Sequence, residues 1–201
     1  SALEAAVARL RKDFPALHVL PVVGDFSQPL ELPRARGARA IYFPGSTIGN
    51  LTPEEAHRFL RMVRDQGRRL IVGVDLKKDA NILHAAYNDS AGVTAAFNLN
   101  LLSRINRELG GDFEMRAFAH YAFYNAPVGR VEMHLVSTRK QAVQVGKRRF
   151  DFDAGESIHT ENSYKYSVEE FHALARRAGW RPRKLWRDAK GLFALHGLEA
   201  G

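Results

Sequence analysis

The fold of this chain is decided by residues 40–75, which read AIYFPGSTIGNLTPEEAHRFLRMVRDQGRRLIVGVD. An apolar run at its start leads into a turn rich in Gly and Ser, after which Thr52 and Pro53 supply a helix N-cap and a first-turn proline. The predicted helix carries apolar residues on one face, and a second apolar run ends on Asp75. Strand, helix and strand in this order predict a doubly wound parallel α/β sheet, whose ligands bind beyond the carboxyl ends of its strands.

The rest of the chain extends this unit on both sides. We expect the other elements to be, in chain order, a helix at 1–14, a strand at 18–23, a helix at 80–109, strands at 130–137, 141–145 and 149–152, a helix from Ser167 to Gly179, and strands at 183–187 and 193–197. The alternation of short strands with helices stops after Asp75. This divides the chain into a sheet core at 1–79, an embedded α+β lobe at 80–166, and a return to the core at 167–201.

Composition excludes several classes of protein. The chain has 201 residues, of which 45% are hydrophobic and 26% charged, and it has no cysteine. No apolar run reaches the length of a membrane span and no signal peptide is visible, so we expect a cytoplasmic protein without membrane association. The net charge of +8 comes from basic clusters scattered along the chain, which favours solvated surfaces over nucleic-acid binding. Its 8 histidines show no metal-ligand spacing, so no metal site is expected.

Two turns at the predicted strand ends are candidate binding loops. In Gly24-Asp25-Phe26 a carboxylate could accept a hydrogen bond from an adenine amino group while the ring covers the base, although a simple strand-ending turn explains the same residues. Between Gly45 and Asn50, glycines allow close backbone approach, and the Asn50 amide can both donate and accept. Such an amide suits a zwitterionic amino acid, and a helix-flanking turn is the alternative.

The third candidate stretch is Ile158-His159-Thr160-Glu161-Asn162-Ser163-Tyr164-Lys165-Tyr166. In an extended chain Glu161 and Ser163 point to the same side, where a carboxylate and a hydroxyl form a clamp that suits an imidazole ring. A surface ion pair between Glu161 and Lys165 explains these residues equally well.

Five segments together resemble a known family. They are GDF (24–26), FPGSTIGNLTPEEA (43–56), DLKKD (75–79), AAYNDSAGVTAAFNLNLL (85–102) and IHTENSYKY (158–166). Their order and spacing resemble those of the L-histidine Nα-methyltransferases of ergothioneine biosynthesis. The resemblance implies a Rossmann-like class I methyltransferase sheet with an embedded substrate-binding lobe. It also implies transfer of methyl groups from S-adenosylmethionine to the α-amine of L-histidine, which gives hercynine.

The resemblance also implies roles for individual residues. Asp25 and Phe26 match the pair that contacts the adenine end of S-adenosylmethionine. Asn50 and Tyr87 match the residues that hold the amino-acid end of histidine and orient its amine for transfer, which is their catalytic role. The positions that match the wall of the substrate pocket are Glu161 and Ser163 as the imidazole clamp, Asn162 between them, Met133 as an apolar wall, and Gly45 and Thr94 as further lining.

One departure from the family bears on the activity. The family's first strand, its glycine-rich loop and its N-terminal helices have no counterpart here, so we expect an N-terminal part of the enzyme to lie upstream or on another chain. Two alternatives therefore stay open beside histidine methylation. One is an N-methyltransferase for another amino acid, such as a tryptophan derivative, and the other is a non-catalytic amino-acid-binding fragment.

Overall fold

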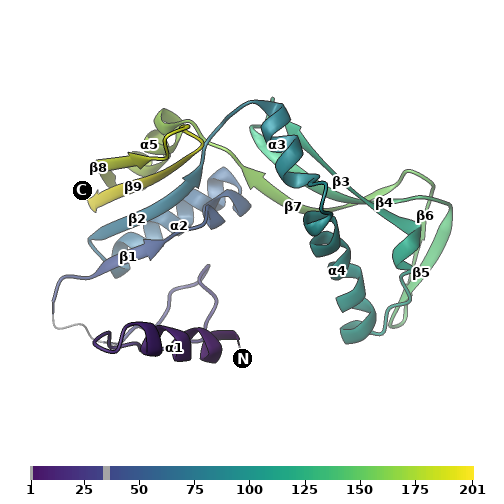
Figure 1. The fold of residues 1–201 in the computed structure, drawn as a ribbon, viewed down its shortest axis with the longest axis horizontal. Coiled ribbons are helices and arrows are strands. Elements are labelled where there is room, and N and C mark those ends of the chain that lie inside the picture. The colour runs from purple at the N-terminus through teal and green to yellow at the C-terminus, as the bar shows by residue number, and fades with distance from the viewer. Residues whose placement is uncertain (1, 34–36) are drawn as a thin grey trace. The chain divides into compact units, whose positions relative to one another are not determined.

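A computed structural model describes residues 2–33 and 37–201, which form two compact units (Figure 1). The first unit, Ser1–Arg39, contains the helix α1 (Ala2–Asp13). The second unit, Ala40–Gly201, contains every strand of the described chain and the other helices.

The strand predicted at residues 18–23 is wrong, because the structure is irregular there. Leu20 and Val23 are 54% and 89% exposed, and Pro21 has no N–H to donate to a ladder. The described residues of the first unit include no strand that could pair with this segment. Asp25 therefore follows a loop and does not mark a strand end.

The second unit opens with the predicted strand–helix–strand core. Its sheet has the order β1-β2-β9-β8. The strands are β1 (Ala40–Phe43), β2 (Arg69–Asp75), β8 (Trp180–Arg187) and β9 (Phe193–Ala200). β1 and β2 are parallel as predicted, whereas β9 pairs antiparallel with β2 and β8 antiparallel with β9. The chain thus forms a mixed sheet, because its last two strands enter as a hairpin.

Two capped helices share one apolar core with this sheet. α2 (Pro53–Gln66) and α5 (Val168–Arg177) each begin with a complete capping box, at Thr52 and Ser167 respectively. Phe59, Val72 and Phe171 lie in the same buried cluster as Trp180, whose indole N–H donates to the Leu60 carbonyl at 2.8 Å. Because this cluster joins both helices to β2, the packed core fixes the position of the carboxyl ends of β1 and β2.

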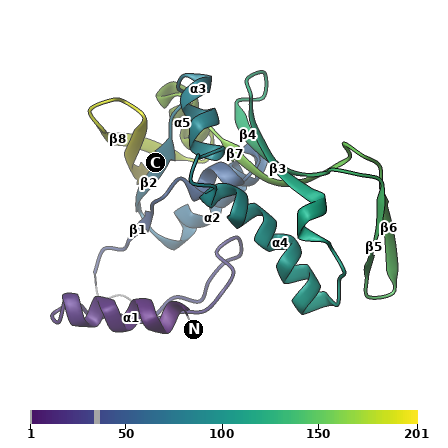
Figure 2. The same cartoon turned by 45° about the vertical axis from the view of Figure 1, so that its right-hand side comes forward.

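The lobe is a second layer of helices on a second sheet (Figure 1). Its elements are α3 (Ala80–Tyr87), α4 (Val93–Leu109), the short helix η2 (Met115–Ala117), and the antiparallel strands β3 (Phe118–Asn125), β4 (Arg130–Ser137) and β7 (Ser157–Tyr164). β5 (Gln141–Val145) and β6 (Arg148–Phe152) form a separate hairpin (Figure 2). The core strands come from both sides of the lobe in the sequence, and the division at 79 and 166 stays a prediction.

The single helix predicted at 80–109 is broken between α3 and α4. Gly92 adopts a left-handed conformation with φ of 70°, and the carboxylate of Asp89 accepts hydrogen bonds from the backbone N–H groups of Val93 and Thr94. The side chain of Asp89 thus caps a new helix, which apolar periodicity alone does not reveal.

The chain returns from the lobe to the core through residues 164–166. Tyr166 forms a parallel bridge with Leu76, and the N–H of Lys77 donates to the Tyr166 carbonyl at 3.0 Å. This junction places the end of β7 against the end of β2.

None of the helices in residues 2–33 and 37–201 has the length and apolar character that crossing a membrane requires.

The buried indole of Trp180 gives a test of the core. We expect Trp180→Phe to lower the free energy of unfolding by about 1–3 kcal/mol, because it removes the indole hydrogen bond to the Leu60 carbonyl and opens a small void. Trp186→Phe on the same strand is the matched control, since Trp186 is 42% exposed. It should change stability by less than about 0.5 kcal/mol. Urea unfolding followed by circular dichroism measures both, and equal losses would contradict the assignment of Trp180 to the core.

Candidate functional site

A hollow lies where the carboxyl ends of β1 and β2 meet the end of β7. Its volume is about 300 Å³, which is within the range of small-ligand sites. The residues that line it are Gly45, Ser46, Thr47, Asn50, Asp75, Tyr87, Glu161, Ser163, Lys165 and Phe193. Five separate stretches of sequence thus supply one site, and five of the predicted substrate residues are among the lining residues: Gly45, Asn50, Tyr87, Glu161 and Ser163.

A strained turn after β1 forms one wall of the hollow. Gly45 and Ser46 both have left-handed backbones, with φ of 75° and 59°. The hydroxyl of Ser46 accepts the N–H of Asp75 at 2.9 Å, which ties the turn to the end of β2. The short helix η1 (Thr47–Asn50) follows, and a Cβ on Gly49 would lie 2.8 Å from the Tyr164 carbonyl. Glycine is therefore required for the turn to lie against β7, with Asn50 at its end lining the hollow.

Lys165 forms the floor of the hollow, and its side chain is 0% exposed. Its ammonium group is 2.9 Å from Oδ2 of Asp75, 2.9 Å from the Tyr87 hydroxyl and 2.6 Å from the Ser163 hydroxyl. The Tyr87 hydroxyl also donates to Ser163 at 2.8 Å. The surface pair of Lys165 with Glu161 that the sequence left open is thus wrong, because Lys165 is buried and binds Asp75.

The sequence does contain a signal for the burial of Lys165. Residues 161, 163 and 165 alternate along an extended chain, so Lys165 points to the same side as Glu161 and Ser163. A lysine on the inward face of a strand is buried only when it is paired, which would have pointed to a partner such as Asp75.

Glu161 lies at the boundary between this hollow and a second one. The second hollow lies along α4 and is lined by Phe97, Asn98, Asn100, Leu101, Arg104, Met133, Thr160 and Glu161. Met133 is directly opposite Glu161 in the pairing of β4 with β7. Burial raises the pKa of Glu161, and the nearby charge of Lys165 partly counters that effect. The carboxylate and Met133 are thus close together, as the predicted wall of an imidazole pocket requires.

Two predicted substrate residues lie elsewhere. The described residues that line the two hollows include neither Asn162 nor Thr94. Asn162 is opposite Glu132 in the strand pairing, and its Oδ1 atom is buried without a hydrogen-bond partner. Thr94 lies in the first turn of α4, where its hydroxyl is 3.5 Å from the Ala86 carbonyl. Their roles in substrate binding stay predictions.

The two predicted cofactor residues belong to the first unit. Hydrogen bonds from the side chain and backbone of Ser27 hold the pKa of Asp25 below its usual range. Phe26 is 45% exposed. An exposed carboxylate next to an exposed ring fits the edge and the face of an adenine, and this role also stays a prediction.

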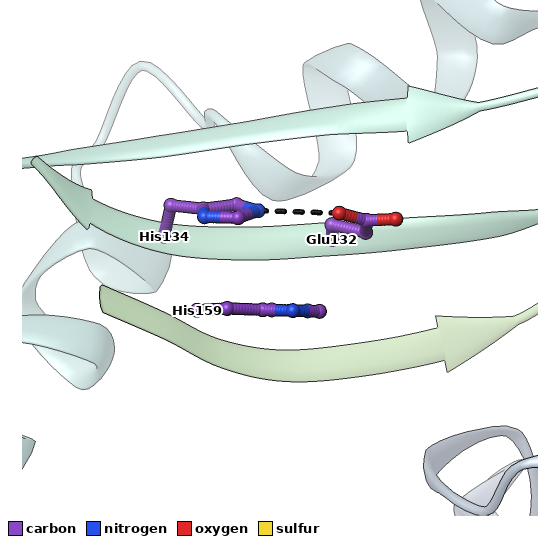
Figure 3. Close-up of side chains that lie close together, drawn as sticks. All are labelled: Glu132, His134 and His159. Atoms are coloured by element: carbon purple, nitrogen blue, oxygen red, sulfur yellow. Dashed lines mark hydrogen bonds and ion pairs between the residues drawn. The ribbon is translucent and has the colours of Figure 1, made fainter. Parts of the chain in front are cut away.

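Glu132, His134 and His159 form a separate cluster on β4 and β7 (Figure 3). Each offers a potential metal ligand, and these atoms lie within 4.8 Å of one another. However, the two imidazoles stack with their planes 14° apart, so their in-plane lone pairs do not converge on one point. Glu132 is already paired with Arg130 at 2.8 Å. The arrangement favours an ion pair beside a ring stack, and the expected absence of a metal site stays a prediction.

The buried carboxylate of Glu132 is strongly acidic. Burial by itself raises its pKa, but hydrogen bonds from Asn125, Arg130 and His134 outweigh it and lower the pKa to about 2. The sequence did not reveal this cluster. Its members lie on two paired strands, and a register shift between Met133 and His134 determines which residues face each other.

Comparisons with known proteins match this chain to a described family. The sequence model of a family described as histidine-specific, SAM-dependent methyltransferases matches residues 1–200. A histidine N-alpha-methyltransferase of Mycolicibacterium smegmatis is 42% identical over 96% of this chain, which spans 62% of that protein's length. Ergothioneine biosynthesis protein 1 of Neurospora crassa is 31% identical over 74% of this chain and 17% of its own. An L-tryptophan methyltransferase of Psilocybe serbica is 29% identical over 80% of this chain and 46% of its own.

A solved structure shows the same fold. It is an S-adenosylmethionine-dependent methyltransferase from Clostridium acetobutylicum, with a TM-score of 0.51 and 12% identity over 99% of this chain and 71% of that one. This likeness confirms the predicted Rossmann-like class I methyltransferase fold.

The low pKa of Glu132 predicts how stability depends on pH. Its stabilising contribution should be complete above the ordinary value of 4.5 and should be lost as the pH falls toward 2. We expect Glu132→Gln to cost about 2 kcal/mol at neutral pH and less than half of that near pH 3. Glu114→Gln, which breaks an exposed pair with Arg139, is the control and should have little effect. A cost that is the same at both pH values in urea unfolding would contradict the assignment.

Proposed function

Since this chain belongs to the histidine-specific, S-adenosylmethionine-dependent methyltransferase family, we propose that the protein transfers methyl groups from S-adenosylmethionine to the α-amine of L-histidine. The product would be N,N,N-trimethylhistidine, called hercynine, on a route to ergothioneine. The observation that carries the proposal is the single hollow that joins Asn50 and Tyr87 to Glu161 and Ser163.

The hollow is lined by two sets of polar groups. Asn50 presents an amide that can accept from an ammonium and donate to a carboxylate, which suits the zwitterionic end of an amino acid. Glu161 and Ser163 offer a carboxylate and a hydroxyl to a ring that has both an N–H and a lone pair, and they would form the ring end of the site. Met133, opposite Glu161 in the strand pairing, would add an apolar wall from the adjoining hollow along α4. Histidine has matching groups at both of its ends.

The chain's own residues would act mainly by positioning. The amine must be neutral to react, and Asn50 and Tyr87 would hold it in line with the methyl carbon while the clamp fixes the ring. S-adenosylmethionine, when bound, would supply an electrophilic methyl: its carbon–sulfur bond would break as the neutral amine nitrogen bonds to the methyl carbon, and S-adenosylhomocysteine would be released. A proton would leave the nitrogen after the first and the second transfer, whereas after the third transfer the nitrogen would stay quaternary. Asp25 and Phe26 would hold the adenine end of that molecule.

A tryptophan derivative is the second candidate substrate, and the likeness to an L-tryptophan methyltransferase raises it. An indole has one N–H and no ring lone pair, so it could satisfy Glu161 but would leave the Ser163 hydroxyl without an acceptor. This mismatch favours histidine over tryptophan.

Product analysis tests the proposal directly. We expect the full-length protein that contains this sequence to convert histidine, in the presence of S-adenosylmethionine, to species that carry one, two and three added methyl groups. Mass spectrometry reads the products of parallel incubations with histidine, tryptophan and phenylalanine. Methylated tryptophan without methylated histidine would keep the family and overturn the substrate. Binding of histidine without any methylated product would favour a non-catalytic amino-acid-binding protein.

Substitution of the clamp tests how histidine is recognised. Glu161→Ala should raise KM for histidine by about 10- to 100-fold with a smaller change in kcat, because a charge-assisted hydrogen bond to the ring is lost in the ground state as well as in the transition state. Glu156→Ala is the control, since that exposed carboxylate lies outside the residues that line the hollow. Steady-state kinetics measure both, and an unchanged KM in Glu161→Ala would contradict the clamp.

A further inference from the structure

The ammonium group of Lys165 uses all of its hydrogen-bonding capacity within the protein. A lysine has three N–H donors and no acceptor, and here the three acceptors are Asp75, Tyr87 and Ser163. The side chain is completely buried, so no N–H remains to contact a ligand in the hollow. Lys165 can therefore influence a substrate only through the residues that it binds.

These contacts determine whether the Ser163 hydroxyl can donate or accept a hydrogen bond in the hollow. A phenol is a stronger acid than an aliphatic alcohol, so the Tyr87 hydroxyl donates to Ser163, at 2.8 Å. Lys165 donates to the same oxygen at 2.6 Å. A serine oxygen has two lone pairs, and both are now occupied. The one capacity left to Ser163 is its own O–H, which makes it a donor toward the hollow.

The ring end of the hollow consequently presents one donor and one acceptor. Ser163 supplies the donor, and the carboxylate of Glu161 supplies the acceptor. A neutral imidazole matches this pair, because one of its nitrogens has a lone pair and the other has a hydrogen. An imidazolium has hydrogens on both nitrogens and would direct one of them at an oxygen with no free lone pair.

We infer that Lys165 is a positioning residue that makes this hollow select the neutral form of the substrate's imidazole. The inference rests on the proposed function and deepens it, since it states which protonation state of histidine binds. It also gives the Asp75–Lys165 pair a role, because Asp75 holds the ammonium in the position from which it reaches both hydroxyls.

Other charges near this point act on an imidazolium as well. Within residues 37–201, the charged and titratable groups around Lys165 are Asp75, Lys78, Tyr87 and Glu161, with Lys78 paired to Asp75. Glu161 alone would attract an imidazolium, and its own protonation would weaken binding of any ring at acid pH. A test must therefore separate protonation of the ring from protonation of Glu161.

A neutral isostere of histidine provides that separation. In β-(1,2,4-triazol-3-yl)alanine the ring is far less basic and stays neutral at mildly acid pH, so its affinity follows the protein's groups and the amine alone. Isothermal titration calorimetry measures the affinity of the full-length protein for each ligand at about pH 7.5 and at about pH 5.5. S-adenosylhomocysteine is present to prevent turnover. The affinity for histidine should fall about tenfold more than the affinity for the triazole, because about a tenth of the imidazole is neutral at the lower pH.

Two variants show whether Lys165 causes this preference. Lys165→Met frees a lone pair on Ser163, and Ser163→Ala removes the oxygen. In each variant the loss of histidine affinity at the lower pH should therefore exceed that of the triazole by only about twofold. Lys140→Met is the control, because that exposed lysine pairs with Asp153 away from the hollow, and it should keep the tenfold excess. Thermal melts check that each variant is folded, and Ser163→Ala serves if Lys165→Met is not.

The outcomes separate this inference from the proposed function. If histidine and the triazole lose affinity in parallel in the wild-type protein, or if folded Lys165→Met keeps the tenfold excess, the inference is overturned while histidine remains the substrate. If histidine does not bind at either pH, both are overturned. If histidine binds with the expected pH dependence but no methylated product forms, the inference holds and the proposed function fails.

Discussion

The contact between Lys165 and Asp75 is the constraint on which the arrangement of the second unit depends. A buried ammonium costs several kcal/mol unless its N–H groups are all satisfied. Here the partners come from the end of β2, from α3 and from β7, so one charge joins the core sheet to both layers of the lobe. The parallel bridge between Leu76 and Tyr166 lies beside it and fixes the same junction through the backbone. The hollow exists because these elements meet there.

Alternation along β7 gives the two faces of the lobe sheet different chemistry. Glu161, Ser163 and Lys165 point toward the hollow, where their polarity matches the ring of an amino acid. Glu132 belongs to the cluster with His134 and His159, and it is stabilised by Arg130 independently of the hollow. Glu161 and Ser163 are suited to recognition and Glu132 to stability, whereas the buried Lys165 serves both.

Local signals predicted much of this fold, and the exceptions have a common cause. The strands at 130–137 and 141–145 and the helices capped by Thr52 and Ser167 were predicted correctly, because alternation and capping depend on neighbours in the sequence. The strand at 18–23 was wrong because a strand also needs a partner, which no local pattern reports. The hollow was predicted in part, since Asn50, Glu161 and Ser163 carried recognisable chemistry. Alternation along residues 161–165 also indicates an inward Lys165, but its pairing with Asp75 depends on how β2 and β7 meet in the fold.

Lys165 and Asp75 shape the hollow that we propose to hold histidine by a neutral ring. Nitrogen-15 NMR of ring-labelled histidine, bound to the full-length protein at about pH 5.5, tests it directly, because most free imidazole is protonated there. We expect one nitrogen with the chemical shift of a lone-pair nitrogen and one with the chemical shift of an N–H nitrogen. Two N–H-type shifts would show a bound imidazolium and would overturn the selection of the neutral ring.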